Sequence, residues 1–151
     1  MLTTGSGRYK VTGATTTRAG RRALLLLCAG AVVGCRPDAS TARGTAERFL
    51  DAHYVRIDLD SALPYTAGLA ARKVRDEIEL TKGQEIDATT RKPSVHYTYL
   101  EEHPAGDGAT NFVYRGTIDV EDADRFQRRW LVTVRHEDAG WRVTNWQEFA
   151  E

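Results

Sequence analysis

The sequence has little cysteine, no net charge and no long hydrophobic run. Two cysteines among 151 residues cannot staple a disulfide-rich miniprotein. The main apolar run, the 12 residues 23–34, is too short for the repeated spans of a multi-span membrane protein. A hydrophobic share of 41% excludes a fully disordered chain. What remains is a chain of about one domain.

The charges are unevenly distributed along the chain. All basic residues before position 35 lie in a segment that contains no Asp or Glu, namely Arg8, Lys10, Arg18, Arg21 and Arg22. The rest of the chain carries 16 basic and 21 acidic residues, a net charge of −5. A basic N-terminal segment followed by a mildly acidic remainder is typical of a targeting segment joined to a globular domain. The acidic body also argues against a nucleic-acid partner.

The basic head ends in an apolar run and a cysteine. Arg21 and Arg22 precede residues 23–34, which would rise about 18 Å as a helix, whereas a hydrocarbon core needs about 30 Å. This pattern is typical of a secretory signal. The residues Val32 to Cys35 resemble the lipobox of bacterial lipoproteins. In that family the cysteine thiol carries a diacylglycerol and the leader is cut just before it.

The resemblance implies a signal peptide over 1–34, a lipidated Cys35 with a short tether over 35–41, and a folded domain over 42–151. The domain would then lie outside the cytoplasm on a bacterial cell membrane, inner or outer. Since Cys35 would be the only cysteine left, the mature chain could form no internal disulfide. Two alternatives stay open: lipidation at Cys28, which follows a bulky leucine, or an ordinary cut near residues 29–34 that leaves a free thiol.

Apolar residues next recur at helical spacing. They predict one helix with a single buried stripe: Ala46, Phe49, Leu50, His53, Tyr54 and Ile57. A break at 58–64 follows, where Asp60 or Ser61 could cap a short second helix.

A third helix is expected from Thr66 to Thr81, ending near Gly83. Its buried side chains would be Leu69, Ala70, Val74 and Ile78. Its solvent-exposed face would carry ion pairs between residues four positions apart: Lys73/Glu77, Arg72/Asp76 and Arg75/Glu79.

After residue 93 the period changes from helical to alternating. Four segments are rich in β-branched and aromatic residues: 94–103, 110–120, 126–136 and 141–149. Turn residues separate them at 106–108, 121–124 and 138–140. Helices followed by successive antiparallel strands predict an α+β domain, with about three helices packed on one face of a curved sheet of about four strands.

These residues resemble a known superfamily. The helix with residues 49–54, the break at 58–63 and the terminal strand 140–146 are similar to the cone-shaped NTF2-like proteins, which include ketosteroid isomerase and SnoaL-type cyclases. The resemblance implies a cavity between helices and sheet. It does not by itself imply an activity.

Strict alternation along the strands selects the side chains that would line this cavity. It places one amide and several aromatic rings inside, and with Tyr54 from the first helix they form the candidate ligand-binding set: Tyr54, Tyr97, Tyr99, Tyr114, Trp130 and Asn145. Aromatic walls with a few polar tips are typical of small-molecule pockets. The alternative is that these rings fill the core.

Few side chains that face the predicted cavity could act as a general base. Strict alternation turns Asp119 and His96 away from the cavity, although one β-bulge would reverse either assignment. His53 and Asp58 remain as the candidates for catalysis by an isomerase- or cyclase-like enzyme.

No metal site or cofactor motif is expected. The four histidines are widely spaced, and the acidic turn at 119–124 lacks the glycine and closing glutamate of an EF-hand. Arg125, Arg128 and Arg129 should form surface pairs beside that turn. The favoured function is therefore a non-catalytic module of a lipid-anchored protein, which binds a small apolar ligand or another envelope protein. A homodimer through the sheet faces stays open.

Overall fold

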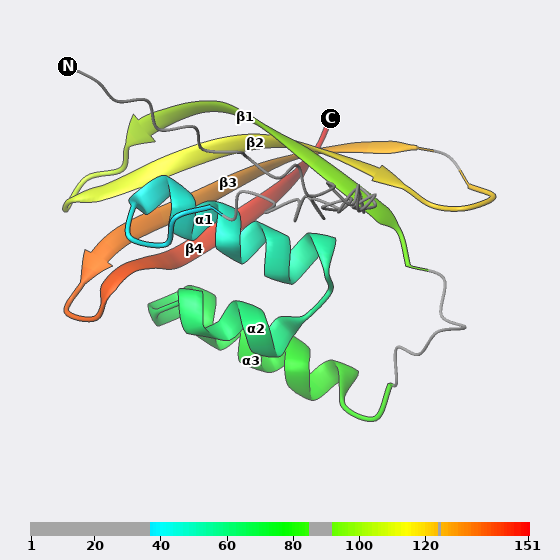
Figure 1. Cartoon of the computed structure of the whole chain (residues 1–151), viewed down its shortest axis with the longest axis horizontal. Coiled ribbons are helices and arrows are strands. Elements are labelled where there is room, and N and C mark those ends of the chain that lie inside the picture. Colours follow the sequence, from blue (N-terminus) through cyan, green and yellow to red (C-terminus); the bar gives the residue numbers. More distant parts are fainter. Residues whose placement is uncertain (1–36, 85–91, 124) are drawn as a thin grey trace, which may run out of the picture. The chain divides into compact units, whose positions relative to one another are not determined.

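A computed structural model describes residues 37–84, 92–123 and 125–151. The expected signal peptide and Cys35 lie outside the described residues. Helices come first and strands follow (Figure 1). The elements are α1 (Ala42–Leu50), the π-helix η1 (Asp51–Val55), α2 (Leu59–Ala62), the 3-10 helix η2 (Leu63–Tyr65), α3 (Gly68–Thr81), β1 (Ser94–Pro104), β2 (Ala109–Asp119), β3 (Phe126–Glu137) and β4 (Gly140–Ala150).

The strands form one antiparallel sheet in the order β1-β2-β3-β4. α1 packs on β3 and β4, and α3 packs on β4, so the helices cover one face of the sheet (Figure 1). The predicted α+β architecture is confirmed. Among the helices of the described segments, none has the length and apolarity to span a bilayer.

The first helix begins where predicted and changes its winding midway. Thr41 caps it by accepting a hydrogen bond from Gly44 N at 3.0 Å, and Phe49 and Leu50 are fully buried. From Asp51 the helix continues as a π-helix, whose wider turn inserts an extra residue. The turn buries Ala52.

The predicted stripe does not continue to Ile57. That residue lies beyond the π-helix with a left-handed φ of 53°, which is unusual for a β-branched side chain.

The short second helix is capped two or three residues earlier than predicted. Asp58, rather than Asp60 or Ser61, is the N-cap, and its carboxylate accepts a hydrogen bond from Ser61 N at 3.0 Å. Hydrogen bonds from the side chain and backbone of Ser61 lower the pKa of Asp58. Asp58 directly follows the left-handed Ile57. Its carboxylate lies at the N-terminus of α2, where the first backbone N–H groups have no partner within the helix.

Two predictions for α3 were wrong. Leu69 is 42% exposed, because the core-facing side of the helix begins with Ala70 and Ala71. Lys73 and Glu77 bind other elements instead of each other: Lys73 reaches β4 and Glu77 reaches His53. Long-range partners thus outweigh a surface pair worth a few tenths of a kcal/mol.

The sheet keeps its predicted alternation over most of its length. On β3, Trp130, Val132 and Val134 are fully buried beneath the helices. The register slips between Thr133 and Val134, where β4 places one extra residue opposite β3. Beyond this bulge Trp146, not Asn145, pairs with Val132 and enters the core. The prediction that Asn145 faces the interior was therefore wrong in its parity.

Candidate functional site

The space between α1 and the sheet is occupied by stacked aromatic rings. Tyr54 lies on Trp130, with ring centroids 4.3 Å apart and planes 18° from parallel. Trp130 also lies against Gly116, where an added Cβ would come 2.7 Å from Cζ2 of the indole. Trp130 is fully buried and its indole N–H has no hydrogen-bond partner. Because Trp130 is fully buried and packs closely on both Tyr54 and Gly116, no room is left for a ligand beside this ring.

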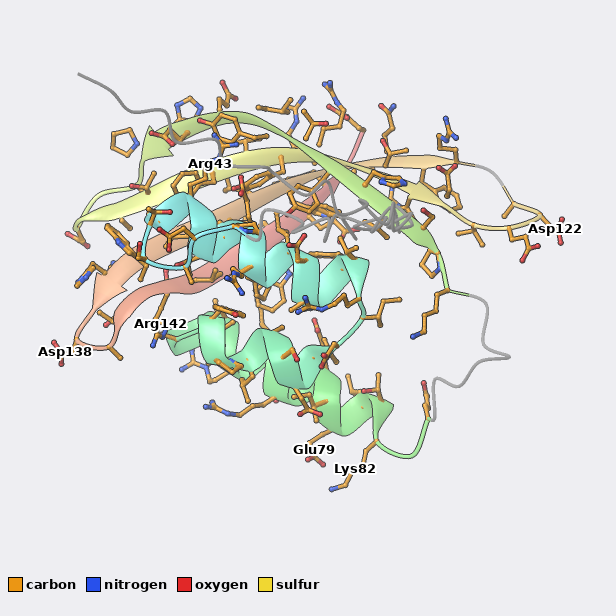
Figure 2. All side chains as sticks on the ribbon, in the orientation of Figure 1. Arg43, Glu79, Lys82, Asp122, Asp138 and Arg142 are labelled. Atoms are coloured by element: carbon orange, nitrogen blue, oxygen red, sulfur yellow. The ribbon has the colours of Figure 1, made fainter. Side chains whose placement is uncertain are left out.

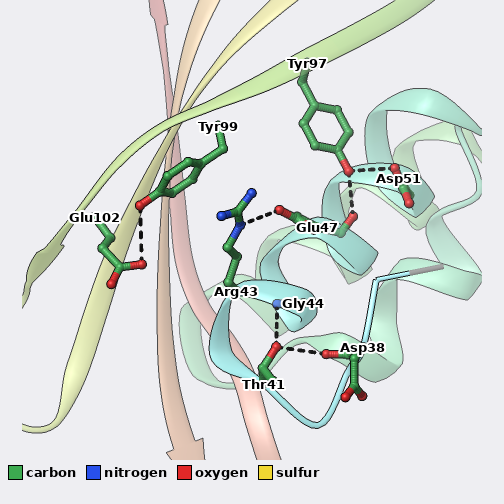
Figure 3. A network of polar contacts seen from close by, with 9 residues as sticks. All are labelled: Asp38, Thr41, Arg43, Gly44, Glu47, Asp51, Tyr97, Tyr99 and Glu102. Atoms are coloured by element: carbon green, nitrogen blue, oxygen red, sulfur yellow. Dashed lines mark hydrogen bonds and ion pairs between the residues drawn. The ribbon is translucent and has the colours of Figure 1, made fainter. Parts of the chain in front are cut away.

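A second group of rings lies between α1 and β1. Tyr97 and Tyr99 meet Tyr114 edge-on, with centroids 5.6 and 5.9 Å away. The Tyr97 hydroxyl donates to Asp51 Oδ1 at 2.8 Å (Figure 3). The Tyr114 hydroxyl is buried without a partner.

The rim of this second group is polar. Arg43 lies over the Tyr99 ring, 4.0 Å from its centroid, and donates to Glu47 Oε1 at 2.7 Å (Figure 3). Tyr99 also donates to Glu102 at 3.4 Å. These contacts join the start of α1 to β1 and close the interior on this side.

Burial holds the interior tyrosines in their neutral form. Desolvation, with Glu148 next to it, raises the pKa of Tyr54 far above its usual range. Desolvation likewise raises the pKa of Tyr97 and Tyr114, and the hydrogen bond to Asp51 adds to the effect at Tyr97. These hydroxyls can donate hydrogen bonds but cannot serve as bases near neutral pH.

His53, one catalytic candidate, is enclosed. Its Nε2 lies 2.6 Å from Glu77 Oε2, and its ring lies within 5.2 Å of the Phe49, Tyr54 and Trp146 rings, centroid to centroid. In the neutral ring Nε2 would donate to Glu77, which leaves the lone pair on Nδ1. Nδ1 is buried without a partner. No substrate proton could reach it in this arrangement.

The other candidates also have structural partners. Asp58 caps α2, as described above. Asn145 accepts a hydrogen bond from Lys73 Nζ at 2.9 Å, and Lys73 also donates to the Trp146 carbonyl. The structure therefore brings the five aromatic candidates together, with Tyr114 and Trp130 fully buried and the other three partly buried around them. Asn145 lies at the junction with α3.

An open cleft lies elsewhere in the domain. This cleft of about 750 Å³ lies between the residues that follow η1, the C-terminal end of α3 and the residue Lys92 just before β1. Its lining includes three basic and three acidic residues: Arg56, Lys82, Lys92, Asp58, Asp60 and Glu79. The strained Ile57 also lines it.

This cleft was not predicted from the sequence. Its lining comes from three segments that show no shared motif, and only the helix break at Asp58 marked part of it. Within residues 37–84, 92–123 and 125–151, no three His, Cys, Asp or Glu side chains are grouped so as to hold a metal ion.

The uncovered face of the sheet is laced by ion pairs. Arg115 and Arg129 both bind Glu151, at 2.8 Å each, and these contacts lower the pKa of Glu151 to about 2. Arg125 binds Asp119 at 2.6 Å beside the acidic turn. Arg128 binds Glu148 at 3.2 Å, so the prediction that Arg125, Arg128 and Arg129 form surface pairs is confirmed for all three.

The domain shares its fold with several solved structures. A protein from Thiobacillus denitrificans, provisionally assigned as a calcium/calmodulin-dependent protein kinase type II association domain, superposes with a TM-score of 0.54 at 14% identity over 74% of this chain and 95% of that chain. A ketosteroid isomerase-like protein from Erwinia carotovora gives a TM-score of 0.52 at 12% identity over 73% and 93%. An NTF2-like protein of unknown function from Shewanella oneidensis gives 0.50 at 14% over 69% and 92%.

These neighbours show an NTF2-like fold, and at such low identity they show the fold alone. No family model and no curated protein matches the sequence.

Proposed function

We propose that this protein is an exported lipoprotein, held on a bacterial cell membrane by a lipid on Cys35, whose NTF2-like domain is a non-catalytic module that binds another envelope protein. The filled interior carries the proposal. Tyr54, Trp130 and Gly116 are in contact through the middle of the domain, so the space that a small ligand would occupy holds side chains. Binding would then use the outside of the domain.

The open cleft supports a protein partner. Its mixed charges and open shape suit a polar surface with both signs, as protein rims have, better than an apolar small molecule. Fold neighbours include a provisionally assigned association domain and an isomerase-like protein, so the fold is compatible with either kind of function.

The alternative is a ketosteroid isomerase- or SnoaL-like enzyme. It would need the lone pair of His53 to face a substrate, and the contact with Glu77 and the surrounding rings disfavours this. It would otherwise need Asp58 to leave its cap position.

Fractionation of the producing cells tests the anchor. The Cys35→Ser variant should leave the membrane fraction, whereas the matched Cys28→Ser variant should stay there, because only one of the two thiols is acylated. Loss of membrane association in Cys28→Ser instead would overturn the assignment of Cys35.

Crosslinking in intact envelopes tests the binding function. A partner crosslinked to the wild-type protein should be lost in the charge-reversed cleft variant Lys82→Glu and retained in Tyr114→Phe, which changes only the interior. Equal crosslinking of both variants would contradict binding at the cleft. Turnover or saturable uptake of a small apolar molecule would contradict a non-catalytic, protein-binding role.

A further inference from the structure

The segment that joins Cys35 to the domain is bound to α1 almost from its start. Arg48 Nε donates to the Pro37 carbonyl at 2.6 Å. The hydroxyl of Thr45, which is 1% exposed, donates to the Ala39 carbonyl at 3.1 Å. The sequence predicted a free tether up to Thr41, but this part of it follows the helix.

A glycine in α1 makes the close approach possible. The Asp38 carbonyl accepts a hydrogen bond from the backbone N–H of Thr41 at 3.1 Å. It accepts a second from the Thr41 hydroxyl at 3.0 Å (Figure 3). A Cβ on Gly44 would overlap that carbonyl oxygen, so the segment fits only against a residue without a side chain. Ser40 donates to the Asp38 carboxylate and thereby lowers its pKa.

The remaining freedom is therefore short. A single residue, Arg36, separates Cys35 from Pro37, and two residue steps span about 7 Å when fully extended. A free tether up to Thr41 would span about 20 Å. The start of α1 must then lie close to an anchor on Cys35.

The start of α1 lies at one end of the domain. Arg43 in the first turn contacts Tyr99, and Asp51 farther along contacts Tyr97, so α1 runs opposite to β1. The start of α1 thus lies near the end of β1, with the turns 105–108 and 138–139 on the same side (Figures 1 and 2). We call this the anchor end.

The turn 120–123 lies at the opposite end, and the 750 Å³ cleft lies towards that side, where α3 ends and β1 begins (Figure 1). An eleven-residue strand such as β1 spans about 35 Å between the two ends. Asp138 and Asp122 mark the two ends in Figure 2.

We propose that the anchor end faces the lipid surface that holds Cys35, and that the cleft faces away from it. This inference rests on the lipidation of Cys35 in the proposed function. The exposed turns of the anchor end carry Asp38, Asp107 and Asp138, which anionic headgroups would repel. The acyl chains supply the affinity, and the short connection from Cys35 to Pro37 sets the orientation.

Depth-dependent quenching tests this orientation on the processed full chain. The protein is purified from its membranes and reconstituted into nanodiscs whose headgroups carry a spin label. A fluorophore is attached to Asp138→Cys at the anchor end or to Lys82→Cys beside the cleft; the thioether on Cys35 blocks labelling there. The label on Asp138→Cys should lose most of its emission, and the label on Lys82→Cys should lose almost none. Ala105→Cys and Ala123→Cys form a second matched pair.

A linker variant supplies the control. Twenty Gly/Ser residues inserted between Arg36 and Pro37 span about 25 Å on average and should equalise the quenching at the two ends. Intact mass is measured first on every sample. A mass without acyl chains would overturn the proposed function. Acylated protein with equal quenching at both ends, or with a contrast that survives the linker, would overturn the orientation alone.

Discussion

The interior beneath α1 and the cleft at the far end of the domain differ in almost every respect. The interior holds closely packed rings, of which Phe49, Tyr114 and Trp130 are fully buried, and its polar atoms include a hydroxyl and an indole N–H without partners. The cleft is open and charged, and it is bordered by a β-branched residue in a left-handed conformation. In the interior, close packing leaves two buried polar groups without hydrogen-bond partners, and such close packing is typical of a protein core.

The difference shows that an aromatic surplus does not by itself mark a pocket. The rings of this domain contribute stability, whereas its accessible polar groups gather where helices end and backbone groups need caps. Backbone strain tends to persist where a surface has a role.

The largest expected effect comes from removing the central ring. Trp130→Ala should lower the free energy of unfolding by about 3–5 kcal/mol, because it empties a fully buried site. Phe126→Ala on the same strand is the control, since Phe126 is 39% exposed and should cost far less. Urea unfolding measures both. Similar losses in the two variants would mean that the interior is not tightly packed.

Adding a single methyl group should sharpen the same point. Gly116→Ala pushes a Cβ into the Trp130 indole and should cost about 1–3 kcal/mol. In a Trp130→Leu background the cost should shrink, because the smaller side chain gives way. A double-mutant cycle measures this coupling. Additive losses would show that the ring does not rest on Gly116.

At the border of the cleft, Asp58→Ala should cost about 1 kcal/mol by removing the cap of α2. Because the pKa of Asp58 is lowered in the fold, its contribution is present above the unfolded pKa of about 3.9 and is lost as the pH falls through the folded value. Stability measured against pH should therefore show a smaller acid loss in the variant than in the wild type. An unchanged pH dependence would contradict the capping role.

The smallest effect distinguishes two neighbouring tyrosines. Tyr97→Phe removes a hydroxyl that donates to Asp51 and should cost about 1 kcal/mol. Tyr114→Phe removes a buried hydroxyl without a partner and should be neutral or stabilising. Thermal unfolding of the pair measures the contrast. A clear loss in Tyr114→Phe would indicate a partner for that hydroxyl, such as a bound ligand.

The sheet could be predicted from the sequence because its signals are local. Alternation selected Phe112, Tyr114 and Trp130 for the inner face, and turn residues separated the strands within one residue of their observed ends. The packing of helices on one face followed from their order along the chain.

The remaining errors have backbone causes. A bulge opposite Thr133 reversed the parity of β4 and exchanged Asn145 for Trp146, and the π-helix ended the stripe before Ile57. Each is one extra residue that periodicity does not reveal. The cleft depends on three distant segments, so it appears only in the folded chain.

The most direct test of the filled interior is calorimetric titration of the wild-type protein with indole, a small apolar ring of the size that the interior already holds. We expect no saturable uptake by the wild type, and uptake with a rise in thermal stability by Trp130→Ala, whose cavity matches indole. Saturable binding of indole to the wild type would show an open cavity and contradict the filled interior. NMR chemical-shift changes at Tyr54 and Tyr114 would place the bound indole in that cavity.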